Sequence, residues 1–412
     1  MASSDTPQTV IRVGVIGLGG AASGMIGKFT RNPRFKVAAA ADIDAEILGW
    51  FQQDYPDAET YPSADGLCAS ENVDLVYIAT PNRFHREHAV MALRSGKHAL
   101  VEKPMAVTLD DADAMVAAAD RGGMLLGVNV KHSFEPRIQK LRELAKSGEL
   151  GELRMMHHWR YQDWLYRPRT PEELTPEWGG GILWRQGGHQ LDLLRTIGGG
   201  LIRSVRGSAQ VWDPTRRVPG AHSAYFEFES GAACTCVYSG HDHYGTRELV
   251  YGFEAGELAD PQSYAEARRE LQSHGNSVEW ETDAARGERY GGNRRREVEP
   301  GQSSQRGEAP GGGAGWILGG PLVVSYDHAD VKLSPGGLMV YGDDKQWEIP
   351  MVMKEDGRDF RLNAFHDAIV TGRPLQCDGA WGRATVEVLL AIEQSGRERR
   401  EVLLQRETAY PD

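Results

Sequence analysis

The first third of the chain alternates short apolar segments with amphipathic ones. The apolar segments are nearly continuous, as expected of parallel strands that are buried on both faces of a sheet. They cover residues 10–17, 35–42, 73–80, 98–103 and 124–130. Helical patterns lie between them, and two of these, 86–96 and 109–123, end at glycines. Strands that alternate with helices predict an α/β fold with a doubly wound parallel sheet of the Rossmann type.

The pattern changes after residue 130. A helix is expected over 135–151, and the segments that follow alternate apolar and polar positions, which is typical of strands with one wetter face. These strand-like segments cover residues 153–161, 202–212, 223–230, 232–240, 321–327 and 337–350. Two amphipathic helices, 358–372 and 382–396, follow. The pattern predicts a C-terminal α/β domain with a large, mostly antiparallel open sheet.

This change predicts two domains, which suits a chain of 412 residues. Residues 10–130 form the first, residues 131–412 the second, and residues 1–9 a disordered tail. Residues 255–315 are rich in Gly, Arg, Glu and Ser and have little apolar periodicity. We interpret them as an insertion, partly helical near 263–272 and mobile around 301–315.

Composition excludes several classes of partner. The net charge of −12 argues against nucleic acid as the main partner. The four cysteines have neither a disulfide framework nor zinc spacing, so buried thiols are expected and a metal is not. Cys234 and Cys236 flank one residue of a strand and should face the same side. The N-terminus has no signal-peptide pattern, and no apolar run approaches the roughly 18 residues of a membrane span, so we expect a cytoplasmic protein without a membrane partner.

A glycine-rich turn marks the cofactor site. Gly17, Gly19 and Ala22 form a G-x-G-x-x-A pattern between a predicted strand and a predicted helix. The first glycine permits the tight turn, and the second lets the backbone approach a pyrophosphate at the helix N-terminus. Asp42 ends the second strand, where a carboxylate accepts hydrogen bonds from ribose hydroxyls and repels a 2′-phosphate. With no arginine nearby in the sequence, the pattern favours NAD over NADP.

Three further motifs carry a family resemblance: ATPNRFH (79–85), GKHALVEKP (96–104) and GGHQLD (187–192). Together with the glycine pattern, they resemble the Gfo/Idh/MocA family of nicotinamide-dependent oxidoreductases. The resemblance runs from residue 10 to about 250 and from about 322 to 404. It implies a Rossmann domain followed by an α/β domain whose open sheet supports the substrate site and often an oligomer interface. A homo-oligomer, a dimer or a tetramer, is therefore expected.

Lys103 is the expected proton acceptor of the reaction. An alcohol that donates a hydride must also lose its hydroxyl proton, and a partly buried lysine beside the nicotinamide can take it. Glu102 is expected to hold the ammonium, and the bond to Pro104 has a raised chance of being cis. By the resemblance, His189 lies against the substrate hydroxyl as a second proton carrier or hydrogen-bond donor. Asp192 would orient His189 or cap its helix.

The resemblance also implies the residues that surround the cofactor. Asn82 and His85 match family positions that line the nicotinamide pocket, although His85 is nearly as well explained as a residue at a helix N-terminus. The full set expected at NAD is Gly17, Gly19, Ala22, Asp42, Thr80, Asn82, His85, Glu102 and Lys103.

Arg185 departs from the family pattern. Many sugar-oxidising relatives carry Asp or Asn four residues before the histidine, but this chain has an arginine, whose planar fork of donors suits a carboxylate. An upstream segment interleaves arginines with aromatic residues where the family builds its substrate wall. The expected substrate contacts are Arg185, Arg160, Trp159, Tyr161, Trp164 and Arg167.

This departure resembles the phthalate cis-dihydrodiol dehydrogenases within the family. The resemblance implies NAD-dependent oxidation of a carboxylated ring cis-diol to a dihydroxyphthalate, an activity of phthalate degradation and aromatic catabolism. Rearomatisation would favour the step, so the site need only position the diol and manage one proton. A sugar or cyclitol dehydrogenase is the alternative, and an NAD-binding sensor without turnover is a third reading. Proton-transferring residues at 103 and 189 favour an enzyme over a sensor.

Overall fold

The first domain is built on a six-stranded parallel sheet in the order β3-β2-β1-β4-β5-β6. In this computed structural model, residues 9–241, 246–249, 266–292, 318–351 and 358–411 are described. The strands are β1 (Ile11–Ile16), β2 (Phe35–Ala41), β3 (Glu59–Tyr61), β4 (Leu75–Ile78), β5 (His98–Val101) and β6 (Leu126–Val128). The predicted strands of this region are present, and the parallel Rossmann-type sheet is confirmed. The short β3 was not predicted, because three half-buried residues carry no clear apolar pattern.

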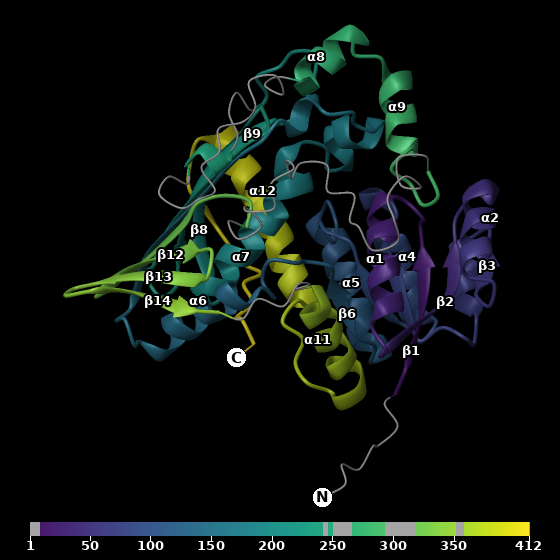
Figure 1. Ribbon diagram of the computed structural model, residues 1–412, viewed down its shortest axis with the longest axis horizontal. Helices are drawn as coiled ribbons and strands as arrows, with labels where there is room; N and C mark the ends of the chain where they lie inside the picture. The colour runs from purple at the N-terminus through teal and green to yellow at the C-terminus, as the bar shows by residue number, and fades with distance from the viewer. Residues whose placement is uncertain (1–8, 242–245, 250–265, 293–317, 352–357, 412) are drawn as a thin grey trace, which may run out of the picture.

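Helices cover both faces of this sheet (Figure 1). They are α1 (Gly20–Arg31), α2 (Ala45–Asp54), α3 (Ala64–Ala69), α4 (His85–Arg94) and α5 (Leu109–Gly122). α1, α2 and α5 present buried apolar residues to the sheet, and α5 ends at Gly123 in the left-handed conformation. The carboxyl ends of β1, β4 and β5 share one edge of the sheet, where the loops expected to bind the cofactor and substrate lie.

The second domain contains a nine-stranded sheet in the order β14-β13-β12-β11-β7-β10-β9-β8-β15. Its strands are β7 (Leu153–Tyr161), β8 (Ile202–Gln210), β9 (Ala221–Phe228), β10 (Ala233–Ser239), β11 (Leu322–Tyr326), β12 (Ala329–Ser334), β13 (Gly337–Gly342), β14 (Gln346–Pro350) and β15 (Val402–Leu403). Every pair is antiparallel except β7 with β10, so the mostly antiparallel sheet is confirmed. The run predicted over 337–350 is two strands, because residues 343–345 form a polar turn between them.

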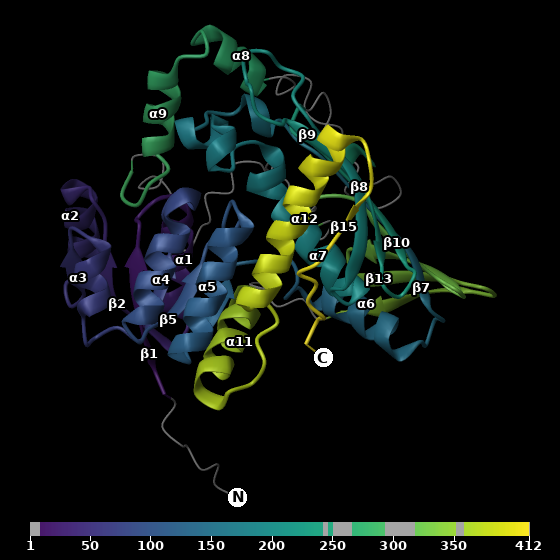
Figure 2. The ribbon, with the colours of Figure 1, turned by 180° about the vertical axis from the view of Figure 1, so that it is seen from behind.

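The remaining helices pack on one face of this sheet or join the two domains. They are α6 (Pro136–Ser147), α7 (Gly188–Gly198), α8 (Glu266–Ser273), α9 (Val278–Arg286), α11 (Arg358–Thr371) and α12 (Gly379–Glu398). α12 lies against β8 and also against α5 of the first domain, and Figure 2 shows it running between the two sheets. Cys234 and Cys236 both lie on the buried face of β10, and the four cysteines are free and buried, as expected.

The predicted insertion is only partly described. The helix expected near 263–272 is present as α8, and α9 follows it. The segment expected to be mobile, 301–315, lies outside the described residues. Across the described ranges, no helix combines the length and apolar character needed to cross a membrane.

Candidate active site

The glycine-rich turn after β1 has the geometry of a pyrophosphate cradle. Gly17 has φ = 86°, and a Cβ atom there would lie 2.9 Å from Thr80 Cγ2 and 3.0 Å from Thr80 N, so only glycine fits. At Gly19, by contrast, a Cβ atom would meet nothing within 4 Å, which leaves open space beside the N-terminus of α1. Gly19 caps α1 without a side-chain hydrogen bond, and Ala22 is buried against the sheet. An open, positively polarised helix end fits a dinucleotide phosphate.

Asp42 lies at the carboxyl end of β2, beside this turn. Its Oδ2 accepts a hydrogen bond from Leu18 N at 2.7 Å, and its Oδ1 accepts one from Asp44 N at 3.0 Å. These contacts hold the carboxylate at the position where a Rossmann domain binds the adenosine ribose. The geometry therefore fits NAD.

Lys103 follows β5 at the same edge of the sheet, and its peptide bond to Pro104 is cis, as the sequence suggested. Its Nζ donates a hydrogen bond to the Arg185 carbonyl oxygen at 2.6 Å. Burial, with Arg185 nearby, lowers the pKa of Lys103 to about 8, although Glu102 acts in the opposite direction. A lysine with this pKa can accept a proton near neutral pH.

The role expected for Glu102 is corrected by its contacts. Its Oε1 accepts hydrogen bonds from the Tyr77 hydroxyl and from Asn129 Nδ2, and its Oε2 accepts one from the backbone N–H of Lys103. Glu102 therefore fixes the backbone before Lys103, and the ammonium itself bonds to Arg185 O. The carboxylate acts on the ammonium only through its charge.

His85 joins the two loops that carry Thr80 and Lys103. It is fully buried, and its ring nitrogens lie 2.9 Å from Pro104 O and 2.8 Å from Thr80 O. Burial lowers the pKa of His85. With both nitrogens on backbone oxygens, its side chain supports the loops of the nicotinamide pocket.

His189 is the second residue of α7, and the charge of Lys103 acts on it. Residues Leu183–Gly187 form a π-helical turn that continues directly into α7. The His189 ring meets the edge of His132 with centroids 5.5 Å apart, and its Nδ1 is buried without a hydrogen-bond partner in the described part of the chain. Burial, followed by the charges of Lys103 and Lys131, lowers the pKa of His189 well below its usual range. The ring is therefore neutral and able to donate or accept one hydrogen bond.

Asp192 does not take the role expected for it. Its Oδ1 accepts a hydrogen bond from Trp381 Nε1 at 2.8 Å, and Trp381 belongs to α12. Asp192 lies in the interior of α7, so it does not cap that helix either. Burial raises the pKa of this carboxyl. It connects α7 to α12 behind the site.

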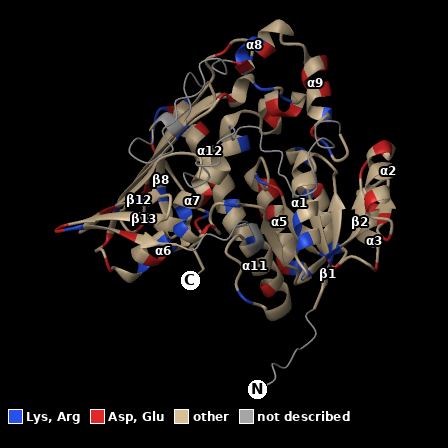
Figure 3. Cartoon of the chain, viewed as in Figure 1, with Lys and Arg blue, Asp and Glu red and all other residues tan. Residues whose placement is uncertain are grey.

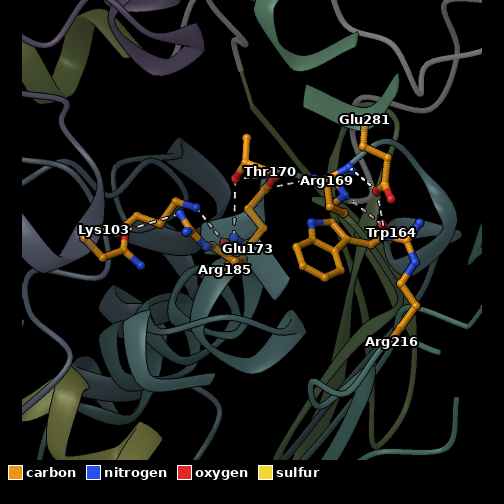
Figure 4. Close-up of polar contacts among 9 residues, drawn as sticks. Lys103, Trp164, Arg169, Thr170, Glu173, Arg185, Arg216 and Glu281 are labelled. Atoms are coloured by element: carbon orange, nitrogen blue, oxygen red, sulfur yellow. Dashed lines mark hydrogen bonds and ion pairs between the residues drawn. The ribbon is translucent and has the colours of Figure 1, made fainter. Parts of the chain in front are cut away.

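Arg185 joins the nicotinamide pocket to the second domain. Its Nη1 donates to Asn82 Oδ1 at 3.3 Å, and its Nε is buried with no hydrogen-bond partner in the described ranges. Figure 4 shows Lys103 beside Arg185, with Glu173 between Arg185 and Arg169. Glu173 is already paired with Arg169 Nη1 at 2.9 Å. Among the described residues, the Nε of Arg185 therefore has no acceptor.

The other expected substrate contacts divide between two faces of β7. Arg160 shares the face of the buried Met156 and His158, and its charge acts on Lys103 and His189. By strand alternation, Trp159 and Tyr161 lie on the opposite face, where Trp159 is 45% exposed. The structure thus does not bring these two side chains to the site.

Two further residues expected to contact the substrate, Trp164 and Arg167, have other partners. Trp164 is buried in a small apolar cluster and stacks under Arg169, whose Cζ lies 4.5 Å from its ring centroid. Arg167 pairs with Asp163 at 2.6 Å. Both support the segment before the site, which corrects their expected role as substrate contacts.

His132 and Glu173 are site residues that the sequence reasoning missed. His132 follows β6 at the sheet edge that also carries Lys103, so its position after a parallel strand could have identified it. Glu173 lies in a short helical turn capped by Thr170, and no local pattern connects it to Arg185.

Comparisons with known proteins agree with this architecture. Residues 11–130 match the oxidoreductase family with an NAD-binding Rossmann fold, GFO_IDH_MocA, and residues 138–257 match the GFO/IDH/MocA C-terminal domain. The 1-carboxy-3-chloro-3,4-dihydroxycyclohexa-1,5-diene dehydrogenase of Comamonas testosteroni is 34% identical over 388 residues, which are 94% of this chain and 95% of that protein. D-glucoside 3-dehydrogenase of Escherichia coli K12 is 30% identical over 243 residues, 54% of this chain and 68% of that protein.

A solved structure has the same fold. The crystal structure of a Bordetella bronchiseptica RB50 protein assigned as a dehydrogenase superposes with a TM-score of 0.83 and is 32% identical. The match covers 96% of this chain and all of that one, so both sheets and their connection are shared.

Proposed function

Because the chain belongs to the Gfo/Idh/MocA family and is an NAD-binding oxidoreductase, we propose that it oxidises a carboxylated aromatic cis-dihydrodiol. The substrate would be of the phthalate cis-dihydrodiol type. One carbinol C–H leaves as hydride, its O–H loses a proton, and the resulting hydroxy-dienone tautomerises to the dihydroxyphthalate. The Comamonas relative supports this substrate class, since its name describes a carboxylated, dihydroxylated cyclohexadiene.

The observation that carries the proposal is the excess of positive charge at the site. Three cationic side chains act on His189, those of Lys103, Lys131 and Arg160. The two carboxylates that act on Arg185 are already paired, Glu172 with Arg83 and Glu173 with Arg169. Partly buried cations are costly unless an anion accompanies them, and a substrate carboxylate would supply that anion.

Arg185 is the residue best placed to bind this carboxylate. Its unsatisfied Nε and its fixed Nη1 provide a planar set of donors next to Asn82 and Lys103. An anion bound there would place the adjoining ring carbons near the Lys103 amine. The ring and its two oxygens would then be held between the first and second domains.

Lys103 and His189 divide the proton chemistry. NAD, when bound, supplies the hydride acceptor. The hydrogen bond to Arg185 O holds the Lys103 amine in place, and its neutral form takes the hydroxyl proton. His189, neutral because of burial, can hydrogen-bond a substrate oxygen and keep it oriented toward Lys103.

Arg185→Ala tests the proposal. It should lower kcat/KM for a carboxylated cis-dihydrodiol by the roughly 1.5–3 kcal/mol of a charge-assisted hydrogen bond, while activity on an uncarboxylated dihydrodiol changes little or improves. Arg185→Lys should recover only part of the loss, because an ammonium lacks the planar fork. Steady-state kinetics on both substrates measure the difference at a pH on the plateau above the rising limb of the pH profile, where Lys103 is neutral in the wild type and in both variants.

The control is Arg154→Ala, which removes an exposed arginine from the far end of β7. It should leave both substrates unaffected. An equal loss on both substrates in Arg185→Ala would show that Arg185 shapes the loop, and the carboxylate assignment would fail.

A sugar or cyclitol substrate is the second candidate, and the similarity to D-glucoside 3-dehydrogenase favours it. That activity needs acceptors for several hydroxyl groups. It predicts turnover of polyols and little effect from Arg185→Ala.

A further inference from the structure

The insertion of the second domain reaches the cofactor turn of the first. Tyr290 N donates a hydrogen bond to Leu18 O at 3.2 Å, and Leu18 lies between the two glycines of that turn. The Tyr290 hydroxyl donates to Asp54 Oδ2 at 2.6 Å, at the end of α2. A Cβ atom at Gly291 would lie 2.5 Å from Trp50 Cε3, so the chain passes in direct contact with α2. Residues 289–291 are therefore docked on the adenosine side of the Rossmann fold.

The other end of this segment is fixed to the second domain. Glu281 of α9 is buried and pairs with Arg216 at 2.7 Å, and its Oε2 also accepts from Arg169 N at 2.8 Å (Figure 4). A buried pair of this kind holds its geometry, because either partner alone would be an uncompensated charge. Figures 1 and 2 both show α9 lying above α1 and α2. α9 thus connects the two domains and fixes the position of residue 289 beside the cofactor turn.

Arg289 is the charged group at that place. Its Nη1 lies 4.0 Å from Asp44 Oδ2, and the backbone N–H of Asp44 bonds to Asp42. The guanidinium is thus close to the carboxylate that faces the adenosine ribose. Both side chains of the Arg289–Asp44 pair are more than one-third exposed, so the pair is weak and the guanidinium can turn to a ligand. Both neighbouring helices carry acidic residues, Glu46 on α2 and Glu279 and Glu281 on α9, and Figure 3 colours acidic positions on these helices red.

We propose that Arg289 contacts the adenosine half of NAD and influences discrimination at the ribose 2′ position. The contact is electrostatic in origin. Asp42 repels a 2′-phosphate, whereas a guanidinium attracts one, so the preference for NAD depends on Asp42 and Asp44 offsetting Arg289. With the 2′-hydroxyl of NAD, the guanidinium donates a hydrogen bond or stacks on the adenine.

Direct binding of two probes tests the contact. Arg289→Ala should weaken binding of NADH and of ADP-ribose by the same factor, roughly three- to tenfold, which corresponds to the loss of about one hydrogen bond at a solvent-exposed position. Equal factors are expected because the nicotinamide half does not reach residue 289. NADH fluorescence and calorimetry with ADP-ribose give the two constants without turnover. Arg286→Ala is the matched control, because Arg286 ends the same helix, is exposed and pairs with Asp283.

Unchanged binding of both probes in Arg289→Ala would overturn the proposal, and so would an equal loss in Arg286→Ala. A second experiment tests discrimination at the ribose 2′ position by measuring NADPH binding. Asp42→Ser should improve NADPH binding, and adding Arg289→Ala should remove most of that gain. No gain in Asp42→Ser, or a gain that survives loss of Arg289, would show that the guanidinium does not face the ribose.

Discussion

The protonation of Lys103 is controlled by side chains from both domains. Burial and Arg185 lower its pKa and Glu102 raises it, which together give a pKa of about 8. If the neutral amine accepts the substrate proton, kcat/KM for oxidation should rise as the pH passes through about 8 and level off above it. Arg185 and Glu102 thus set the working pH range from opposite sides.

We expect the pH profile to move in opposite directions in two variants. Arg185→Ala removes a cation, so the Lys103 pKa and the rising limb should shift to higher pH. Glu102→Gln removes an anion, so the limb should shift to lower pH. In Lys103→Met the rising limb of the pH profile should disappear, and turnover should fall roughly 10²–10⁴-fold. Binding of NADH should be retained. A limb that stays near pH 8 in Lys103→Met would assign the proton to another group.

At the scale of elements, the site depends on how α7 is held. α7 carries His189 in its first turn and Asp192 one turn later, and Asp192 accepts the indole hydrogen bond of Trp381 on α12. Arg195, one turn later, stacks on the same indole and donates to Trp381 O at 3.0 Å. This buried connection fixes α7 relative to α12, which also contacts α5 of the first domain.

The Asp192 contact should therefore matter for stability more than for chemistry. Asp192→Ala leaves the Trp381 indole N–H without its acceptor and removes one of the carboxylates that act on Arg195, so it should cost about 1–3 kcal/mol, seen as a lower midpoint of unfolding in urea. Asp192→Asn keeps an acceptor oxygen and should retain most of the stability. A large fall in kcat for Asp192→Asn at normal stability would restore a direct role at His189.

At the scale of the whole molecule, we propose that residues 10–130 carry the cofactor and residues 131–412 the substrate and oligomer contacts. The outer face of the nine-stranded sheet exposes a row of large apolar side chains. Strand register places them on one face: Met155 and Trp159 of β7, Val323 of β11, Tyr225 of β9 and Tyr341 of β13. Several exposed large apolar side chains on one face of a sheet are typical of a subunit interface.

Val323→Glu lies at the centre of this row and should dissociate a homo-oligomer, because it introduces a charge into the apolar face. Sedimentation velocity measures the change in mass. Val278→Glu is the control. Val278 is 61% exposed and belongs to α9, which lies away from β12, β13 and β14 in Figure 1. An unchanged mass in Val323→Glu, or a monomeric starting protein, would place the interface elsewhere or exclude it.

The sequence by itself determined the elements and the positions of the main chemical groups. Continuous apolar strands, the glycine turn at Gly17 and the segment around Lys103 are local patterns, because each depends on backbone conformation and burial within a few residues. The same reasoning predicts the cofactor at the carboxyl end of the parallel sheet. His189 was identified by its motif, and its neutrality follows from burial.

Only the tertiary structure decided which side chains meet. Glu102 accepts hydrogen bonds from Tyr77, Asn129 and the Lys103 backbone rather than from the Lys103 ammonium. Asp192 accepts a hydrogen bond from Trp381, which lies 189 residues away in the sequence. Trp159 lies on the outer face of the nine-stranded sheet. Arg289 lies beside Asp44, although no arginine is near Asp42 in the sequence. Such contacts depend on how two sheets and an insertion pack together, and no local periodicity encodes that packing, since it is set by complementary surfaces far apart along the chain.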